Sequence, residues 1–461
     1  MHFTTRLLIS AGACIAGGAA SGADLVAPAA KRLDAYFDAL AKHELANGSI
    51  AISERGVLRY RRSVGSAIIS SKGNEPADAG TRYRIGPVSR LYTATLVMQL
   101  VEGASITLDS KLAEFYPDLP NALEITYRDL LQQRSGLANY TDAPDFETWR
   151  TGPATHADLL KIIAGGGVKF PPRARVEDND SNYLLLGYVL EKIYERSFDE
   201  ILQRQITGKL GLARTYYAGG GITSLESISY RSSPTGWVAQ APTDPSIHGG
   251  AGGLISTPAD LVTFIDAVFT GKLLTEHSLA SMRSQEGGSG MGLSPYAVAG
   301  QTGYGIGGDI EGFRACVYYF PEKKLAISYA TNASVLSMDE IVDESLALVF
   351  ERGRKPPTFE PVRLTGHGLA EYAGTWRTAS GQPDNTPFRR FEAPDEPIVL
   401  VVKAGTDAAL VTLNGRDFPL AALGNDEFSL REMGYFLRFN PRADELVVRG
   451  PERSYYLRRA R

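Results

Sequence analysis

A serine hydroxyl becomes a nucleophile when a base lies in hydrogen-bond reach, and a lysine three residues later on the same helix face provides such a base. No lysine of this 461-residue chain has a serine three positions before it. No tyrosine is followed two positions later by an asparagine, another pair that could pass protons to and from a reacting group. The chain therefore lacks both of these local side-chain arrangements.

Two letter patterns resemble binding loops for a dinucleotide and for calcium. Gly303-x-Gly305-x-x-Gly308 has the dinucleotide spacing, but such a loop opens a helix, and the next segment, 313–320, is predicted to be a strand. Asp178-x-Asp180-x-Asn182 matches half of a calcium loop, but Tyr183 and Val189 replace the required Gly and Glu. The six histidines show no metal-ligand spacing. We expect no cofactor and no metal.

Composition and charge narrow the class of protein. Apolar residues make up 43% of the chain and charged residues 22%, which is typical of a folded protein and excludes a disordered one. Lys and Arg number 48 and Asp and Glu 52, giving a formal net charge of −4. Without a basic excess, we expect no nucleic-acid partner. No run of eighteen apolar residues occurs, so no transmembrane segment is expected.

The first 23 residues have the layout of a secretory signal peptide. A short basic start is followed by a small, apolar run and by small residues at Ser21-Gly22-Ala23. Cys14 leaves a lipoprotein signal as an alternative, although Ala11 stands where leucine is usual. We therefore expect an exported protein, periplasmic or secreted. After cleavage only Cys316 remains, so no intrachain disulfide can form.

The elements that would position a site fall into two blocks. Hydrophobic periodicity predicts helices at 31–44, 90–102, 183–196 and 337–351, and strands at 49–53, 57–64, 313–320 and 325–331. The helix at 90–102 is apolar almost all round and should be buried, whereas the one at 183–196 is predicted to be amphipathic. The inner stripe of the second helix would be Tyr183, Leu186, Leu190 and Ile193.

After this mixed region the pattern changes. Residues 352–368 are basic, proline-bearing and aperiodic, as in a linker. Short strands follow at 398–403, 409–413, 427–432, 435–439, 445–449 and 454–457, which indicates a small antiparallel barrel or sandwich. The predicted organisation is a signal peptide (1–23), an α/β mixed domain (24–351), a linker (352–368) and an all-β domain (369–461).

Five blocks between 31 and 351 resemble, in order, the serine β-lactamase and penicillin-binding protein family, in its class C β-lactamase and D-alanyl-D-alanine peptidase branch. The blocks are Tyr83–Ala94, Ile125–Leu131 with Ser135–Leu137, Asn182–Gly187, Gly250–Leu261 and Gly312–Leu325. The resemblance implies an antiparallel sheet flanked by helices, plus an all-helical part. Residues 369–461 resemble, through Glu371–Arg377, the lipocalin-like barrel that follows this domain in some members.

The resemblance also locates the family's catalytic positions. Pro87 stands at the serine and Arg90 at the lysine one helical turn later; proline has no nucleophilic atom, and arginine keeps its proton in a protein. The Tyr-x-Asn motif falls on Asp178-Asn179-Asp180, and the Lys/His-Thr-Gly strand on Ile306-Gly307-Gly308. Gln301-Thr302-Gly303 mimics the latter five residues out of register. All three motifs are degenerate.

Three functions remain open. The motif losses favour a non-catalytic homologue that binds a peptide, a peptidoglycan-like ligand or a partner protein. The alternatives are an active hydrolase, peptidase or esterase using other residues, and a structural envelope scaffold whose cleft is filled by its own side chains. Candidate pocket residues are Arg90, Asp178, Asp180, Ile306, Gly307 and Gly308.

Two local expectations follow from these positions. A buried arginine is costly unless a carboxylate pairs with it, so we expect an ion pair between Arg90 and Asp178 or Asp180. Ser89, the nearest hydroxyl, lies two helical residues from Pro87, about 200° of rotation away. It should face backbone groups and not the cleft.

Overall fold

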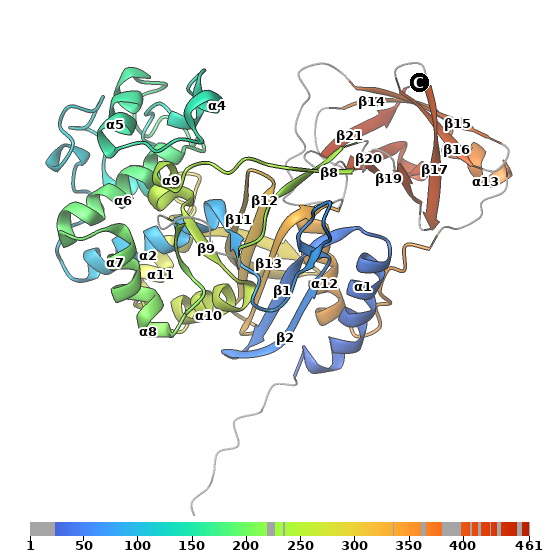
Figure 1. The fold of residues 1–461 in the computed structure, drawn as a ribbon, viewed down its shortest axis with the longest axis horizontal. Helices are drawn as coiled ribbons and strands as arrows, with labels where there is room; N and C mark the ends of the chain where they lie inside the picture. Colours follow the sequence, from blue (N-terminus) through green and yellow to red (C-terminus); the bar gives the residue numbers. More distant parts are fainter. Residues whose placement is uncertain are drawn as a thin grey trace, which may run out of the picture.

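The computed structural model describes residues 24–218, 226–233, 236–334, 336–360, 366–379, 398–405, 408–413, 416–424, 426–430, 435–449 and 454–460. The predicted signal peptide, with Cys14, lies outside the described residues, as do 361–365 of the predicted linker. The described chain forms a large α/β part and a small β-barrel (Figure 1). None of the helices in these ranges combines the length and apolar character that a membrane crossing needs.

A six-stranded antiparallel sheet forms the centre of the large part. Its order is β10 (Ser294–Val298), β11 (Gln301–Ile310), β12 (Phe313–Phe320), β13 (Leu325–Ser334), β1 (Ala46–Glu54) and β2 (Val57–Val64). The predicted strands at 49–53, 57–64, 313–320 and 325–331 are confirmed. The two ends of the domain meet here, because β1 pairs with β13 over its whole length, with Ile52 opposite Ile327.

Both faces of this sheet are covered by helices. Helices α1 (Ala30–Lys42) and α12 (Met338–Phe350) contribute to the core on one face, and α2 (Ser89–Glu102) and α10 (Pro258–Phe269) to the core on the other. Strand β12 supplies Cys316 and Tyr318 to the first core and Ala315 and Val317 to the second. Burial on both faces accounts for the nearly continuous apolar sequence of β12.

An all-helical part lies beside the sheet, at the left of Figure 1. It contains α3 (Tyr127–Leu131), α4 (Phe146–Trp149), α5 (His156–Gly165), α6 (Asp180–Tyr194), α7 (Phe198–Leu202), α8 (Gly208–Leu210), α9 (Pro245–Gly252) and α11 (Glu276–Arg283). A short sheet of β5 (Tyr83–Arg84), β9 (Leu254–Ser256) and β6 (Tyr216–Tyr217) leads into α2. Two further short pairs are β3 (Ser66–Ile68) with β4 (Glu75–Pro76), and β7 (Tyr230–Ser233) with β8 (Gly236–Ala239).

The two central helices differ in how well they were predicted. Helix α2 is buried along almost its whole length, as expected. Helix α6 is more extensively buried than the predicted amphipathic pattern implies, since Leu184, Leu185 and Val189 are buried as well as Tyr183 and Leu190. The reason is that α6 packs against α2, α3 and α9 at once, so little of its first three turns faces solvent.

The C-terminal part is a closed antiparallel barrel of eight strands. Its strands are β14 (Gly374–Thr378), β15 (Val399–Ala404), β16 (Ala409–Leu413), β17 (Arg416–Gly424), β18 (Glu427–Leu430), β19 (Tyr435–Asn440), β20 (Glu445–Arg449) and β21 (Ser454–Arg459). Pairing of β14 with β21 closes it, so the sandwich alternative is wrong. Strand β17 was not predicted, because Pro419 and a run of alanines interrupt its alternation.

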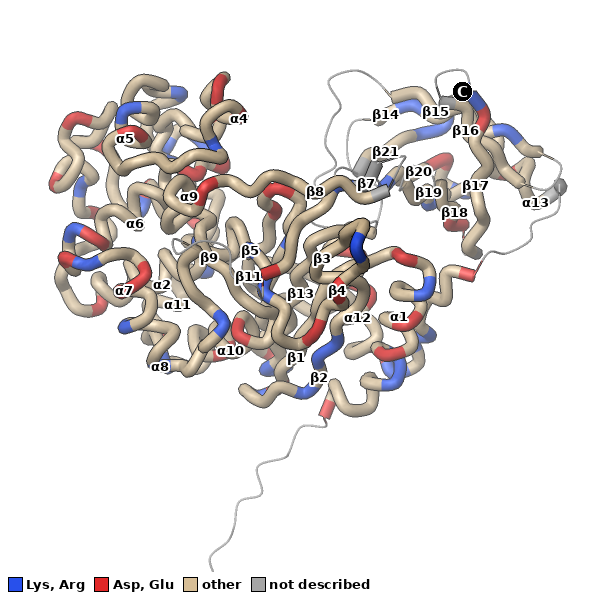
Figure 2. The backbone as a smooth tube through the Cα atoms, in the orientation of Figure 1, with Lys and Arg blue, Asp and Glu red and all other residues tan. Residues whose placement is uncertain are grey.

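The barrel contacts the large part through α12, and residues 352–360, which follow α12, also pack against the large part. Arg449 of β20 pairs with Glu340 of α12 and, at 3.2 Å, with Glu427 of β18. Residues 352–360 contain no helix or strand, whereas residues 366–368 of the predicted linker belong to helix α13 (Gly366–Ala370). Phe359 is only 8% exposed, and its ring lies 6.1 Å from that of Tyr36. This part of the predicted linker is thus packed in place and is not a free tether. Positive and negative residues are interspersed along both parts (Figure 2).

Candidate functional site

The site begins where β5 leads into α2. Gly86 adopts φ +48°, and a Cβ atom there would come within 3.0 Å of Ile310. Pro87 follows in a single 3₁₀ turn (Gly86–Val88) and is half-buried. Proline suits this first turn, because its fixed φ matches the helix and its missing N–H is not needed there. The position that the family resemblance assigns to a nucleophile therefore holds a ring that begins the helix.

Strand β11 lies directly against this ring. A Cβ atom at Gly308 would sit 2.5 Å from Pro87 Cγ, so only glycine fits at this contact. Ile306 lies two residues before Gly308 and on the same face of the strand, half-buried. Gly307 faces the other way, toward Tyr318 and Cys316, which corrects its prediction as a pocket residue.

The same contact bears on where the third motif lies in β11. Gly308, in the segment Ile306–Gly308 to which the resemblance assigns this motif, lies against Pro87. Gln301-Thr302-Gly303 starts the strand five residues earlier. The assignment of the motif to Ile306–Gly308 stays a prediction.

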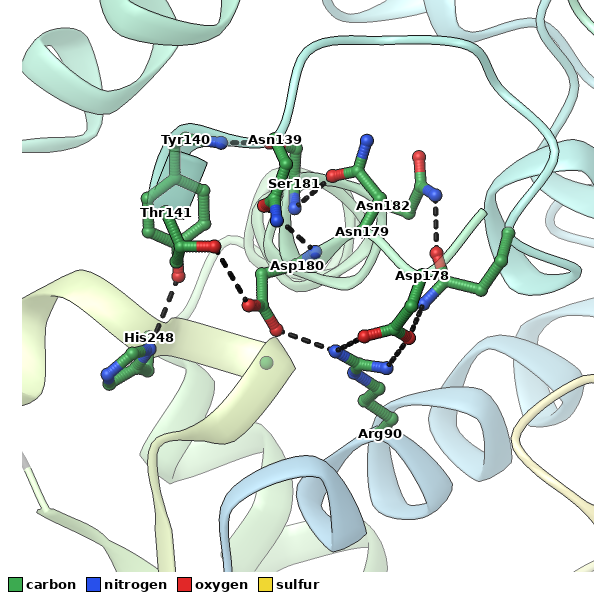
Figure 3. Close-up of polar contacts among 12 residues, drawn as sticks. Arg90, Asn139, Tyr140, Thr141, Asp178, Asn179, Asp180, Ser181, Asn182 and His248 are labelled. Carbon is green, nitrogen blue, oxygen red and sulfur yellow. Dashed lines mark hydrogen bonds and ion pairs between the residues drawn. The ribbon is translucent and has the colours of Figure 1, made fainter. Parts of the chain in front are cut away.

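Arg90 lies one helical turn after Pro87 and is held by two carboxylates (Figure 3). Its Nη1 lies 2.5 Å from Asp178 Oδ1, and its Nη2 lies 2.7 Å from Asp180 Oδ1. Nη2 also donates to Asp178 Oδ2 at 3.3 Å. The predicted ion pair is confirmed, and Arg90 pairs with both acids rather than with only one of them.

Burial within this cluster is uneven. The side chain of Arg90 is 7% exposed, that of Asp180 24% and that of Asp178 76%. The guanidinium also lies over the ring of Tyr183, 5.7 Å from its centroid. Burial acts to lower the pKa of Arg90, but the charges of Asp180 and Asp178 outweigh it and raise that pKa above its ordinary value. The guanidinium stays protonated, so no proton acceptor exists where the family resemblance places a lysine.

The two acids are held by the start of α6. Asn179 caps this helix, its side chain accepting from the N–H of Ser181 at 2.8 Å and donating to the carbonyl of Leu137 at 2.7 Å. Asp178 lies before the cap and Asp180 in the first turn, where the helix dipole favours a negative charge. One capping residue therefore places both carboxylates around Arg90.

A chain of amides supports the outer acid. Gln133 donates to Asp178 Oδ1 at 3.3 Å and accepts from the side chain of Asn182 at 2.5 Å. Asn182 in turn accepts from Ser135 Oγ at 2.5 Å. Gln133 was not singled out in the sequence. Its position two residues before Ser135-Gly136-Leu137, a block of the family resemblance, was the available signal.

A buried histidine and glutamate lie close to the cluster. His248 Nδ1 is 3.3 Å from Tyr140 Oη, and His248 Nε2 is 3.6 Å from Glu311 Oε1. Glu311 also accepts from the N–H of Thr243 at 2.8 Å. Burial acts to raise the pKa of Glu311, but the contacts with His248 and Thr243 and the charge of Arg84 outweigh it and lower that pKa. The sequence offered no signal for this group beyond the adjacent Gly250–Leu261 block.

Ser89 carries the hydroxyl nearest to Pro87 in sequence, but this hydroxyl is not accessible to the His248–Glu311 pair. It is fully buried, and its Oγ accepts from the N–H of Leu254 at 3.2 Å, as the sequence predicted. Across the described ranges, no cluster of three or more His, Cys, Asp or Glu side chains is placed to hold a metal ion. The arrangement holds a fixed charge cluster and contains an imidazole at His248, but the serine that begins α2, Ser89, is buried and bonded to the backbone.

The profile of the Beta-lactamase family matches residues 33–350. The chain belongs to this family. The curated relatives include the teichoic acid D-alanine hydrolase of Staphylococcus aureus, 27% identical over 252 residues, or 54% of this chain and 57% of that protein. The chain thus spans little more than half the length of this relative.

Solved structures share the fold. A D-amino acid amidase from Ochrobactrum anthropi SV3 has a TM-score of 0.62 at 22% identity. The superposition covers 71% of this chain and 99% of the amidase chain. An octameric penicillin-binding protein homologue from Pyrococcus abyssi has a TM-score of 0.64 at 20% identity and covers 93% of this chain and 99% of its own. At these identities the likeness establishes the β-lactamase fold alone.

Proposed function

We propose that this β-lactamase-family protein is an exported, non-catalytic member that binds a peptide or peptidoglycan-like ligand without acylating it. The observation that carries the proposal is the Arg90 guanidinium held by Asp178 and Asp180 beside Pro87. Acyl transfer through a serine needs a hydroxyl and a base that can take its proton. The head of α2 offers neither in usable form, because Pro87 has no hydroxyl, the hydroxyl of Ser89 is buried, and Arg90 retains its proton.

A single reversion would not restore the chemistry. In Pro87→Ser the new hydroxyl would lie one turn from a guanidinium that is already bonded to two carboxylates. The positions that the resemblance assigns to Tyr and Asn would still carry Asp178 and Asp180. We therefore expect Pro87→Ser to remain unreactive toward penicillins.

The charge of the cluster favours particular ligand ends. Two carboxylates against one guanidinium leave a net negative charge, and Asp178, the more exposed acid, faces outward. Ile306 stands where the resemblance places a group that binds a substrate carboxylate, and losing such a charge-assisted hydrogen bond costs about 1.5–3 kcal/mol. Neutral or cationic peptide ends should therefore bind better than penicillin-like carboxylates.

The names of the relatives support a ligand with a D-amino acid. One relative is a teichoic acid D-alanine hydrolase and one structural neighbour is a D-amino acid amidase. Calorimetric titration with amidated and free-acid forms of one D-Ala-D-Ala peptide tests the proposal. The amide should bind more tightly, and Asp178→Asn should reduce this preference, whereas Glu322→Gln, on a distant exposed turn, should not.

The outcomes of this titration also separate the scaffold alternative. Tighter binding of the free acid would contradict the proposed charge preference. No binding of either peptide would contradict ligand binding and would favour a structural scaffold, in which Arg90 serves only to pair with Asp178 and Asp180.

A second candidate function rests on the buried histidine. His248 with Glu311 and Tyr140 is the kind of group that accepts a proton, and it favours a hydrolase that uses non-standard residues. Hydrolysis of chromogenic esters of small D-amino acids tests this candidate. Turnover that disappears in His248→Ala would support this candidate and overturn the non-catalytic proposal.

A further inference from the structure

A cavity of about 500 Å³ lies between α6, α9 and the start of α7. Its α6 residues, Gly187, Tyr188 and Glu191, follow Asp180 by about two to three helical turns. The two helices cross closely here, because a Cβ at Gly187 would lie 3.2 Å from the backbone nitrogen of Gly250. The volume is in the range of small-molecule sites, which span about 300–1,000 Å³. This cavity is separate from the Arg90 cluster and does not depend on the function proposed for it.

Aromatic rings form much of the cavity wall. Tyr188 and His156 stack with ring centroids 3.7 Å apart. Phe198 and Tyr217 meet edge to face, with centroids 5.9 Å apart. All four rings line the cavity. The faces of tyrosine and phenylalanine rings attract cations, so such a wall is suited to an ammonium group.

The wall carries two acidic side chains and one histidine, His156. Glu191 and Asp244 line the cavity, and none of its lining residues is lysine or arginine. Glu191 is fixed in place, because its Oε1 accepts from the N–H of Phe198 at 2.8 Å while its Oε2 lies 3.5 Å from His156 Nε2. Asp244 is likewise fixed by Ser246, whose N–H and hydroxyl both donate to Asp244 Oδ1. An anion would find no cationic lysine or arginine here, whereas a cation would find two carboxylates.

One buried polar atom in the wall lacks a partner. Tyr188 is only 3% exposed, and its hydroxyl has no hydrogen-bond partner among the described residues. Buried hydroxyls are normally bonded, so this atom indicates a place for a ligand group. Tyr217, across the cavity, has its hydroxyl occupied by the carbonyl of Pro245 at 2.7 Å. The unmet bond is thus confined to Tyr188.

We propose that this cavity binds a primary organic ammonium group, with the alkyl chain against the aromatic rings and the N–H bonds shared by Tyr188 and Glu191. The carboxylate accepts hydrogen bonds and the oxygen of the Tyr188 hydroxyl can also accept one, and this favours a primary ammonium, which has N–H donors, over a quaternary one, which has none. Amino-terminated peptides and lysine side chains are ligands of this class.

The first test uses the wild-type protein with three probes of similar length, n-pentylamine, pentyltrimethylammonium and 1-pentanol, in ligand-observed NMR titrations. We expect saturable binding of n-pentylamine, weaker binding of the trimethylated ion, and binding of the alcohol weaker by about tenfold or more. Equal binding of the amine and the alcohol, equal or tighter binding of the trimethylated ion, or no saturable binding of the amine would each overturn the proposal. This comparison requires no variant to fold.

The second test locates the binding. Glu191→Gln keeps an acceptor for the N–H of Phe198 but removes the charge, and it should weaken n-pentylamine binding by about tenfold. Tyr188→Phe keeps the ring and should weaken it several-fold. Glu322→Gln, which removes one negative charge away from the cavity, should leave it unchanged. Unchanged binding in Glu191→Gln, or an equal loss in Glu322→Gln, would overturn the assignment.

Discussion

The two carboxylates that hold Arg90 should differ in their contribution to stability. Asp180→Asn removes the charge from a bond to a guanidinium that is 7% exposed, and also removes a negative charge from the first turn of α6. A hydrogen bond to a charged group contributes about 1.5–3 kcal/mol, and the helix-dipole interaction about 0.3–1 kcal/mol. We therefore expect Asp180→Asn to lower the free energy of unfolding by about 2–4 kcal/mol.

Asp178→Asn should cost much less. Its side chain is 76% exposed, so solvent screens its charge, and exposed ion pairs contribute about 0–1 kcal/mol. Removing both charges leaves a buried cation without a partner anion, which typically costs 3–5 kcal/mol. Adding Arg90→Met to the double variant removes that cation and should recover most of the loss.

Urea unfolding followed by hydrogen exchange of the α2 and α6 peptides measures these differences separately from the barrel. The expected order of destabilisation is Asp178→Asn, then Asp180→Asn, then the double variant, with recovery in the triple variant. A larger cost for Asp178→Asn than for Asp180→Asn would refute the reasoning from burial. Failure of Arg90→Met to recover stability would refute the view that an unpaired buried charge causes the loss.

Three further predictions concern other buried groups. The folded state lowers the pKa of Glu311 below its ordinary 4.5. The stability that this carboxylate contributes is therefore present above pH 4.5 and is lost as the pH falls through the lowered value. When unfolding is measured across an acid titration, Glu311→Gln should lose less stability than the wild-type protein. Burial raises the pKa of Asp266 above its ordinary 3.8, so its charge is a cost at neutral pH. Asp266→Asn should therefore stabilise the protein by about 1 kcal/mol at pH 7, with the gain vanishing below pH 3.8 in the same titration, and a destabilised variant at pH 7 would contradict this. Gly308→Ala should destabilise by about 1–3 kcal/mol, because its methyl group would overlap the Pro87 ring, whereas Gly353→Ala, with open space around it, should be neutral in thermal melts.

The sequence predicted the large part best where local pattern and burial agree. The strand 313–320 was predicted with the bounds of β12, because a short, nearly continuous apolar run between polar turns has few other interpretations. The burial of helix α6 was underestimated because periodicity reports one apolar stripe and cannot show that three helices surround it. Strand β17 was missed because its alternation is weak and its position is fixed by pairing with β16 and β18.

The part of the site that the sequence predicted is the part to which the family resemblance assigns roles, namely Arg90 and the segment 178–180. Charge balance in a shared cleft predicted the ion pair of Arg90 with the segment 178–180. His248 and Glu311 could not be found this way, because they come from separate segments that only the fold brings together, whereas the position of Gln133 beside the Ser135-Gly136-Leu137 block was a signal that went unused. The orientation of Gly307 also needed the strand register, since adjacent residues of a strand face opposite sides.

The central claim is that the head of α2 cannot form an acyl-enzyme. Incubation of the intact protein with a fluorescent penicillin, followed by gel fluorescence and mass spectrometry, tests it directly, with an active penicillin-binding protein as the positive control. We expect no fluorescence and no mass increase in either the wild-type protein or Pro87→Ser, and the same with a fluorophosphonate. A covalent adduct that maps to a serine of the β-lactamase domain in the wild-type protein would contradict the account.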